Sequence, residues 1–173
     1  PEGLGRVRVR FPWLSQDDAS HWARIAVGMA GKDRGMFFLP EVDDEVLVAF
    51  EHGRPEYAYV LGALWNGKDT PPTDNADGKN NLRMLRSRSG HEIVLDDTDG
   101  AEKVIVRDGG GNNSVVIDVA EGSITITADK KLVIACDGDI SLGGDNAKIA
   151  LKGSELTVEC QAVNINNGAL EVS

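Results

Sequence analysis

The sequence predicts an all-β protein in which a small five-stranded barrel is followed by a long series of repeated strands. Three observations support this prediction. Short runs rich in β-branched and aromatic residues, bounded by Gly, Pro or Asp, fill the first part of the chain. Apolar pairs separated by one residue recur through the rest of it. All three Trp, both Tyr and all four Phe lie between Phe11 and Trp65, so the composition changes along the chain.

The first part contains five strand-like runs without a helical period. Five short strands favour a small closed barrel, of which the OB-fold is the common five-stranded form. We therefore expect residues 1–66 to form an OB-fold domain, with the aromatic residues as its core. The predicted strands are Gly5–Phe11, Trp22–Val27, Gly35–Leu39, Glu45–Glu51 and Tyr57–Trp65.

A segment rich in Pro, Gly, Asn and Asp follows the barrel. It reads "NGKDTPPTDNADGKNN" over Asn66–Asn81, which is typical of an irregular connector. We expect the connector itself at residues 67–81 and a repetitive β-helix domain at residues 82–173.

The repetitive part is built from apolar pairs on alternate positions. From Ile117 onward the second members of successive pairs are 9, 8, 8, 9, 7, 7 and 7 residues apart. This period is too short for a helical solenoid, but it suits a strand of about five residues and a tight turn. The pairs are Ile93/Leu95, Val104/Val106, Val115/Ile117, Ile124/Ile126, Leu132/Ile134, Ile140/Leu142, Ile149/Leu151, Leu156/Val158, Val163/Ile165 and Leu170/Val172.

Each repeat has one apolar face and one face of Thr, Ser, Asp, Lys or Glu, so the apolar faces must meet across an axis. Two architectures do this: a single-chain β-solenoid with three repeats per coil, or three chains wound around one axis. Small aliphatic side chains and the absence of aromatic ones fit a narrow three-sided core. The predicted trimer core comprises Ile117, Ile124, Ile126, Leu132, Ile134, Ile140, Leu142, Ile149, Leu151, Leu156, Val158, Val163 and Ile165.

The composition argues against several functional classes. The net charge of −10 disfavours nucleic-acid binding, because a phosphate backbone needs a basic face. Three histidines, His21, His52 and His91, lack the spacing of metal ligands. With no nucleophile and base in a recognisable pattern, we expect no catalytic, cofactor-binding or metal-binding residues and no enzyme activity.

Two charged motifs have structural interpretations. The "DDTDG" run, Asp96–Gly100, lacks the distal Glu of a calcium-binding loop, so we expect a hairpin turn between Leu95 and Lys103. Arg83, Arg86 and Arg88 lie close together in "RMLRSRSGH". They form either a solvated face or, as we slightly favour, pairs with Asp residues of a neighbouring subunit.

Two long stretches of this sequence resemble one family. "GRVRVRFPWL" and "HWARIAVGMAGKDRGMFFLPEVDDEVLVAFEHGRPEYAYVLGALWNGKDTPP" resemble the OB-fold segment of VgrG proteins, phage baseplate spikes and the spikes of extracellular contractile injection systems. "SGHEIVLDDTDGAEKVIV" resembles the segment that follows that domain in the same proteins, and the repeats resemble their trimeric β-helix. Some relatives carry a lysozyme domain after the OB-fold, and the connector here is too short for one.

The resemblance implies a structural central spike, a five-stranded OB-fold barrel followed by an intertwined trimeric β-helix needle that pierces membranes. It implies a homotrimer that contacts inner tube and baseplate proteins, a PAAR-type tip protein, an effector and, transiently, a target membrane. Its implied location is the baseplate of a phage-tail-like particle, assembled in the bacterial cytoplasm and delivered or released extracellularly. No cofactor is implied. Because the chain begins at Pro1 without Met, we expect it to be a piece of a longer protein.

Two other functions remain open at this stage. The repeats also suit an adhesive or carbohydrate-active β-solenoid of a tail fibre, although sugar-binding solenoids would be expected to expose aromatic residues. A nucleic-acid-binding OB-fold protein is disfavoured by the charge and by the acidic "PEVDDEV" loop.

Overall fold

The structure confirms the all-β class. The computed structural model describes residues 3–13, 19–144, 151 and 157–158, and within them it contains eleven strands and one short 3-10 helix, η1 at Glu51–Gly53. None of the helical residues in these ranges forms a segment long and apolar enough to cross a bilayer. Contacts divide the chain into one unit from Pro1 to Asp129 and another from Lys130 to Ser173. The predicted domain boundaries at residues 66 and 82 remain predictions.

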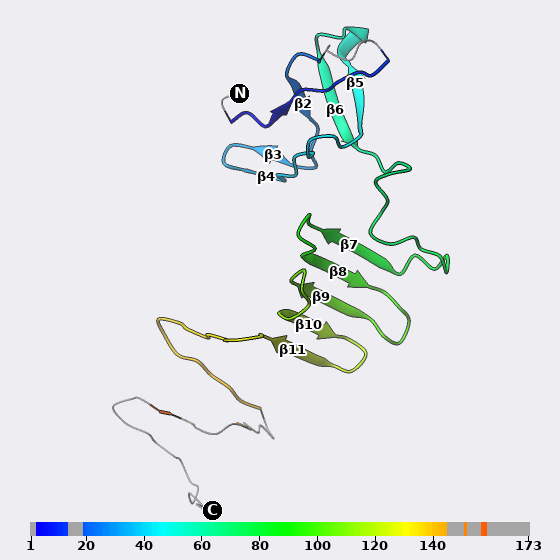
Figure 1. Cartoon of the computed structure of the whole chain (residues 1–173). Helices are drawn as coiled ribbons and strands as arrows, with labels where there is room; N and C mark the ends of the chain where they lie inside the picture. The colour runs from blue at the N-terminus through cyan, green and yellow to red at the C-terminus, as the bar shows by residue number, and fades with distance from the viewer. Residues whose placement is uncertain (1–2, 14–18, 145–150, 152–156, 159–173) are drawn as a thin grey trace, which may run out of the picture. The chain divides into compact units, whose positions relative to one another are not determined.

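The first sheet has four strands in the order β1-β2-β6-β5. Strand β6 lies parallel to β2 and antiparallel to β5, and a register shift between Leu47 and Val48 bends β5. A separate hairpin joins two further short strands, β3 and β4. The strands, several of them visible in Figure 1, are β1 (Arg6–Val7), β2 (Ala23–Ile25), β3 (Ala30–Gly31), β4 (Arg34–Gly35), β5 (Val46–Phe50) and β6 (Ala58–Ala63).

The core of this sheet is aliphatic rather than aromatic, contrary to our expectation. Ala23, Ala58 and Val60 are buried, and five partly buried hydrophobic side chains pack against them: Val7, Val9, Ile25, Val46 and Val48. Among the aromatic residues that the structure describes, Phe11 is the buried one. Alternate residues of a strand point to opposite faces, so the small residues of β2 and β6 face the core while larger ones face outward.

The predicted strand at Gly35–Leu39 is wrong. The chain instead turns at Asp33, whose φ is +55°, and forms the β3–β4 hairpin, which ends at Gly35. The amide of Met36 donates to the carbonyl of Met29 at 2.9 Å and closes this hairpin. The following "MFFL" run is not in a strand, and its side chains are exposed.

The second sheet is a five-stranded antiparallel meander, in which each strand pairs with its neighbour in sequence. Figure 1 shows these strands side by side in chain order. Four of them carry the first four predicted apolar pairs. The strands are β7 (Leu82–Arg86), β8 (Glu92–Asp96), β9 (Lys103–Arg107), β10 (Ser114–Asp118) and β11 (Ser123–Thr127).

Side chains close the hairpin turns of this sheet. Asp96 Oδ1 accepts hydrogen bonds from the amide of Thr98 at 3.0 Å and from its hydroxyl at 2.6 Å, which confirms the predicted turn at "DDTDG". Asp108 accepts from the amides of Asn112 and Asn113 in the next turn. Such local bonds substitute for backbone pairing where the chain reverses.

This pairing corrects one feature of the predicted arrangement of three chains wound around one axis. In that arrangement the repeats from Val115 onward would pair with strands of the other chains, yet β10 and β11 pair with each other in full register over five residues. The two repeats belong to a single-chain meander because a short turn, Val119–Gly122, connects them directly. Beyond Asp129, the described residues contain no strand.

Candidate interaction surface

One face of the second sheet is almost entirely aliphatic. Residues opposite one another in an antiparallel pair point to the same side, so the register defines two cross-strand rows on this face. Arg83 is the one charged residue in them. We call the other nine residues the aliphatic face: Leu95, Val104, Ile117 and Ile124 in one row, and Leu85, Ile93, Val106, Val115 and Ile126 in the other.

The aliphatic face is open to solvent in the single chain. Eight of its nine side chains are exposed, from 39% for Val115 and Ile117 to 69% for Ile124. The exposure is greatest on β11, the edge strand. Exposed apolar patches of this kind are typical of interaction surfaces.

The opposite face covers itself with charged side chains. A central row of Met84, Val94, Ile105 and Val116 lies between two charged rows. In one charged row, Glu92 is buried at 7% exposure and forms ion pairs with both Arg86 and Arg107. These long side chains shield the central row, and Val94 is only 5% exposed. One face of the sheet therefore exposes aliphatic side chains, whereas the other shields its apolar row with charged ones.

In the other charged row, contacts between neighbouring side chains shift pKa values. Lys103 Nζ lies 2.7 Å from Asp118 Oδ2, and this contact lowers the pKa of Asp118 and raises that of Lys103. Hydrogen bonds from Thr98 lower the pKa of Asp96. Hydrogen bonds from Asn113 do the same for Asp108 in the neighbouring turn. All four groups are therefore charged at neutral pH. Their ion pair and hydrogen bonds stabilise the edge of the sheet and its turns.

The chain after Asp129 exposes its apolar residues in the same way. Leu132, Ile134, Ile140 and Leu142 are 53–69% exposed. No strand in the described part of this unit pairs their backbone. The apolar surface of the sheet is therefore followed in sequence by a segment with the same residue pattern.

The predicted trimer core falls into three groups. Ile117, Ile124 and Ile126 share the aliphatic face. Six others are exposed: Leu132, Ile134, Ile140, Leu142, Leu151 and Val158. The remainder lie outside the described residues: Ile149, Leu156, Val163 and Ile165. Assembly of these residues into one core remains a prediction.

The predicted core begins at Ile117, later in the sequence than the aliphatic face of the sheet. It omitted six residues that the sheet register places on the same face: Leu85, Ile93, Leu95, Val104, Val106 and Val115. The signal for most of them was present, because two apolar pairs precede Val115/Ile117 with the same internal spacing, and Val115 is the first member of that third pair. Leu85 has no apolar partner two residues before it, since Arg83 stands there.

The arginine cluster pairs within its own chain. Arg83 forms an ion pair with Asp97, Arg86 with Glu92, and Arg88 with Glu41. Each of the three arginines therefore has an acidic partner within the single chain. Pairing with Asp residues of a neighbouring subunit stays a prediction. The antiparallel register places acidic residues of β8 and its turn directly beside β7, so a local partner is already in reach.

The histidines serve turns. His91 Nδ1 accepts a hydrogen bond from the amide of Gly109 at 3.1 Å and so links two neighbouring turns. His52 adopts a left-handed conformation in η1 with φ +49°, and His21 is exposed. Across the described ranges, no three His, Cys, Asp or Glu residues are grouped so that they could hold a metal ion.

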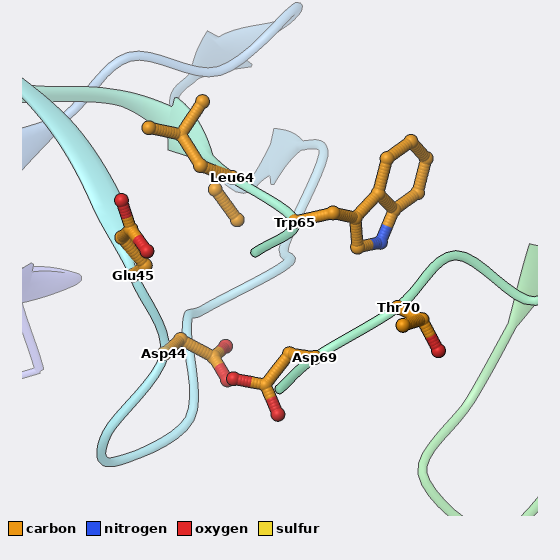
Figure 2. A pocket seen from close by; sticks show the side chains of 7 residues that line it. Asp44, Glu45, Leu64, Trp65, Asp69 and Thr70 are labelled. Carbon is orange, nitrogen blue, oxygen red and sulfur yellow. The ribbon is translucent and has the colours of Figure 1, made fainter. Parts of the chain in front are cut away.

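A hollow of about 350 Å³ next to β5 and β6 gathers several carboxylates. Figure 2 shows Asp44, Glu45 and Asp69 around it, with the Trp65 ring extending away. Asp44 accepts a hydrogen bond from the amide of Glu41, and Asn66 Nδ2 donates to Glu45 and Asp69. These bonds close the local loops, so the carboxylates have a structural role.

Comparison with known proteins links the first sheet to injection machines. Residues 1–65 match the family model described as the type VI secretion system/phage-baseplate injector OB domain. This agrees with the OB-fold that the strand pattern predicted.

Curated relatives extend the similarity. The chain is 31% identical over 114 residues to the type VI secretion system spike protein VgrG1b of Pseudomonas aeruginosa, covering 59% of this chain and 15% of that protein. It is 30% identical over 114 residues to the spike protein VgrG3 of Vibrio cholerae, covering 61% of this chain and 11% of that protein. It is 28% identical over 109 residues to the actin cross-linking toxin VgrG1 of Vibrio cholerae, covering 58% and 10% respectively. The chain therefore spans well under a fifth of the length of these relatives.

Proposed function

Because the chain belongs to the VgrG and phage-baseplate spike family, we propose that it is a structural part of the central spike of a contractile injection system. The observation that carries the proposal is the uncovered aliphatic face of β7–β11. It continues in sequence into further repeats whose apolar residues are also exposed.

In this proposal the spike is a homotrimer. Three copies of the β7–β11 sheet pack their aliphatic faces together around one axis, and the charged faces look outward. Small aliphatic side chains suit the narrow space at a three-fold axis, and no aromatic residue follows Trp65. The main stabilisation is removal of apolar surface from water, at about 25 cal/mol per Å².

The segment after Asp129 completes the needle in this proposal. Its repeats receive backbone partners from the two other chains, and its apolar pairs extend the same core. Every strand of this segment then bonds to a different chain, so this part of the rod resists shear and transmits thrust to a membrane. Strands spaced about 4.8 Å apart would give such a rod its length.

The partners and location follow the family. We propose that the trimer contacts inner tube and baseplate proteins and carries a PAAR-type tip protein or an effector. We place it at the baseplate of a phage-tail-like particle. One relative is named as an actin cross-linking toxin, but this chain covers only a tenth of it. We propose no enzymatic activity for this segment.

The oligomeric state tests the proposal. Light scattering coupled to gel filtration should give three times the chain mass of 18.5 kDa. A monomeric mass at micromolar concentration, with intact β-sheet circular dichroism, would reject the trimer.

Cys136 offers a second test of the parallel arrangement. It has the strand parity of Leu132 and Ile134, so three copies of Cys136 should meet at one level of the axis. In a Cys160→Ser background, mild oxidation should give disulfide-linked dimers on a non-reducing gel. The Cys136→Ser variant of the same background is the matched control and should give none. Absence of dimers from an oxidised trimer would contradict the parallel arrangement.

A further inference from the structure

The outer face of the first sheet carries a row of arginines. Along β1 and the residues after it, Arg6, Arg8 and Arg10 are exposed, while Val7 and Val9 between them pack toward the core. Arg24 of β2 lies directly opposite Arg6 in the antiparallel register. A compact basic surface therefore lies on a chain whose net charge is −10.

This arrangement opposes the stability of the sheet. Directly opposed side chains have Cβ atoms about 4.5–5.5 Å apart, and like charges at that distance destabilise a pair of strands. In the described part of the chain no carboxylate offsets this repulsion, because none forms an ion pair with Arg6, Arg8 or Arg24. All five ion pairs involve other cations: Arg83, Arg86, Arg88, Lys103 and Arg107.

Two aromatic rings hold the arginine head groups in place. Arg8 Cζ lies 5.2 Å from the centre of the Trp22 ring, and Arg24 Cζ lies 5.6 Å from that of Tyr59. Tyr59 is fixed in turn, because its hydroxyl donates to Glu51 at 2.8 Å. A guanidinium resting on a ring keeps its fork of N–H donors available to a planar anion.

We propose that this surface docks an extended acidic segment of another protein. We call it the arginine face and define it as Arg6, Arg8, Trp22, Arg24 and Tyr59. A carboxylate placed between Arg6 and Arg24 would relieve their repulsion and accept charge-assisted hydrogen bonds from both. Charge complementarity therefore identifies the partner as anionic.

The geometry favours an extended partner. Arg6 of β1 and Arg8 just after it are two residues apart, which corresponds to about 6.6–6.8 Å where the chain is extended as in a strand. Acidic residues at alternate positions of an extended peptide have the same spacing. Strand β1 also lies at the edge of its sheet, with β2 as its one neighbour in the described residues, so it can accept an added strand.

An acidic protein segment fits better than a nucleic acid. The basic surface is small, and a long phosphate backbone would extend from it onto a strongly acidic chain. A short peptide can place its carboxylates over the arginines alone. The inference does not rest on the proposed trimer, because the arginine face and the aliphatic face lie on different sheets.

A labelled peptide tests the inference. The whole chain should bind a fluorescein-labelled peptide of alternating Glu and Thr in an anisotropy titration. The matched peptide of alternating Gln and Thr should not bind. The Arg6→Ala/Arg24→Ala variant should weaken binding by at least about tenfold, the factor that corresponds to about 1.4 kcal/mol. Binding should also quench the fluorescence of Trp22 in a variant with Trp13→Phe and Trp65→Phe.

A matched variant separates specific docking from general charge. Arg83→Ala also removes one cation, but Arg83 is already paired with Asp97 on the other sheet, so binding should be unchanged. Circular dichroism of each variant checks that the sheet remains folded. Three results would overturn the inference: no binding of the Glu-Thr peptide, equal loss with Arg83→Ala, or tighter binding of an oligothymidylate of equal length.

Discussion

The second sheet and the chain that follows it share a sequence pattern but differ in how their backbones are paired. In β7–β11 every strand finds its hydrogen-bonding neighbour within the chain. From Lys130 to Gly143, alternating apolar residues continue, yet no strand is present in the described residues. Both regions expose their apolar side chains. The apolar pattern alone therefore does not decide whether a repeat pairs within its own chain.

The two regions also differ in their turns. In the sheet, Asp96, Asp108 and Asp118 each accept backbone hydrogen bonds inside the turn that follows their strand. In the later segment, the chain bends at Asp137 and Gly138, and the side-chain bond described there runs from Cys136 Sγ to the carbonyl of Gly138. An Asp that fixes a reversal brings the next strand back beside the last one. Without this constraint, a strand with the same pattern is free to pair with another chain.

The largest effect should come from a charge on the aliphatic face. Ile124→Asp should convert the trimer to a monomer, because three carboxylates would meet in an apolar core. Ile124 is 69% exposed in the single chain, so its own sheet should tolerate the change. Light scattering measures the mass, and circular dichroism checks that the sheet remains.

The control lies next to it on the same strand. Thr125 points to the opposite, charged face and is exposed, so Thr125→Asp should leave the trimer intact. If both variants remain trimeric, the aliphatic face is not the interface. If both become monomeric, the effect comes from charge on β11 rather than from the face.

A deletion tests whether each repeat in the segment after Asp129 is a structural unit. Removing residues 132–139 deletes eight residues, the spacing between Ile134 and Leu142, and brings the next apolar pair into the same position. The shortened chain should still form a trimer with a similar melting temperature. Removing residues 132–135 alone should lower the melting temperature sharply, because a turn would fall where a strand is needed. Equal tolerance of both deletions would show that the repeat is not a structural unit.

Much of the fold was accessible from sequence. Strands β8 to β11 lie where apolar pairs alternate with polar residues, because period-two alternation matches a sheet with one apolar face. The strand predicted at Gly35–Leu39 failed because a short apolar run does not show where the chain turns, and here a turn at Asp33 pairs Arg34 and Gly35 back onto Ala30 and Gly31. The aromatic core failed because composition does not say on which face of a strand a ring points, and Trp22 is on the outer face.

The candidate surface was only partly accessible. Ile124 and Ile126 were predicted from their spacing, but the contribution of Leu85 required the register of β7 against β8. The ion pairs of Arg83 and Arg86 likewise depend on which residues lie across the strand pair. Cross-strand partners are set by turn length, so a single-residue uncertainty in a turn changes every pair.

A smaller effect is expected on the free energy of unfolding, where a buried charge of the sheet should matter more than an exposed one. Glu92→Gln should destabilise the protein by about 2 kcal/mol, because it weakens charge-assisted hydrogen bonds around a nearly buried group. Asp97→Asn, which breaks the exposed pair with Arg83, should cost about 0–1 kcal/mol. Urea denaturation of both variants measures the two values. If Asp97→Asn lowers the free energy of unfolding more than Glu92→Gln does, the buried ion pairs of Glu92 are not the more stabilising ones.

The smallest effect should appear as a dependence on pH. Lys103 lowers the pKa of Asp118 below its ordinary value of 3.8, so the carboxylate stabilises the folded state at pH values above that. As the pH falls through the folded pKa, Asp118 takes up a proton and this stabilisation is lost. The pKa of Lys103 is raised above 10.5, so its contribution is present below that value and is lost as the pH rises through the folded pKa. The melting temperature of wild type should therefore exceed that of Asp118→Asn between these limits, and the gap should close in acid. A gap that stays constant from neutral pH down to about 2 would show that Asp118 acts through its shape rather than its charge.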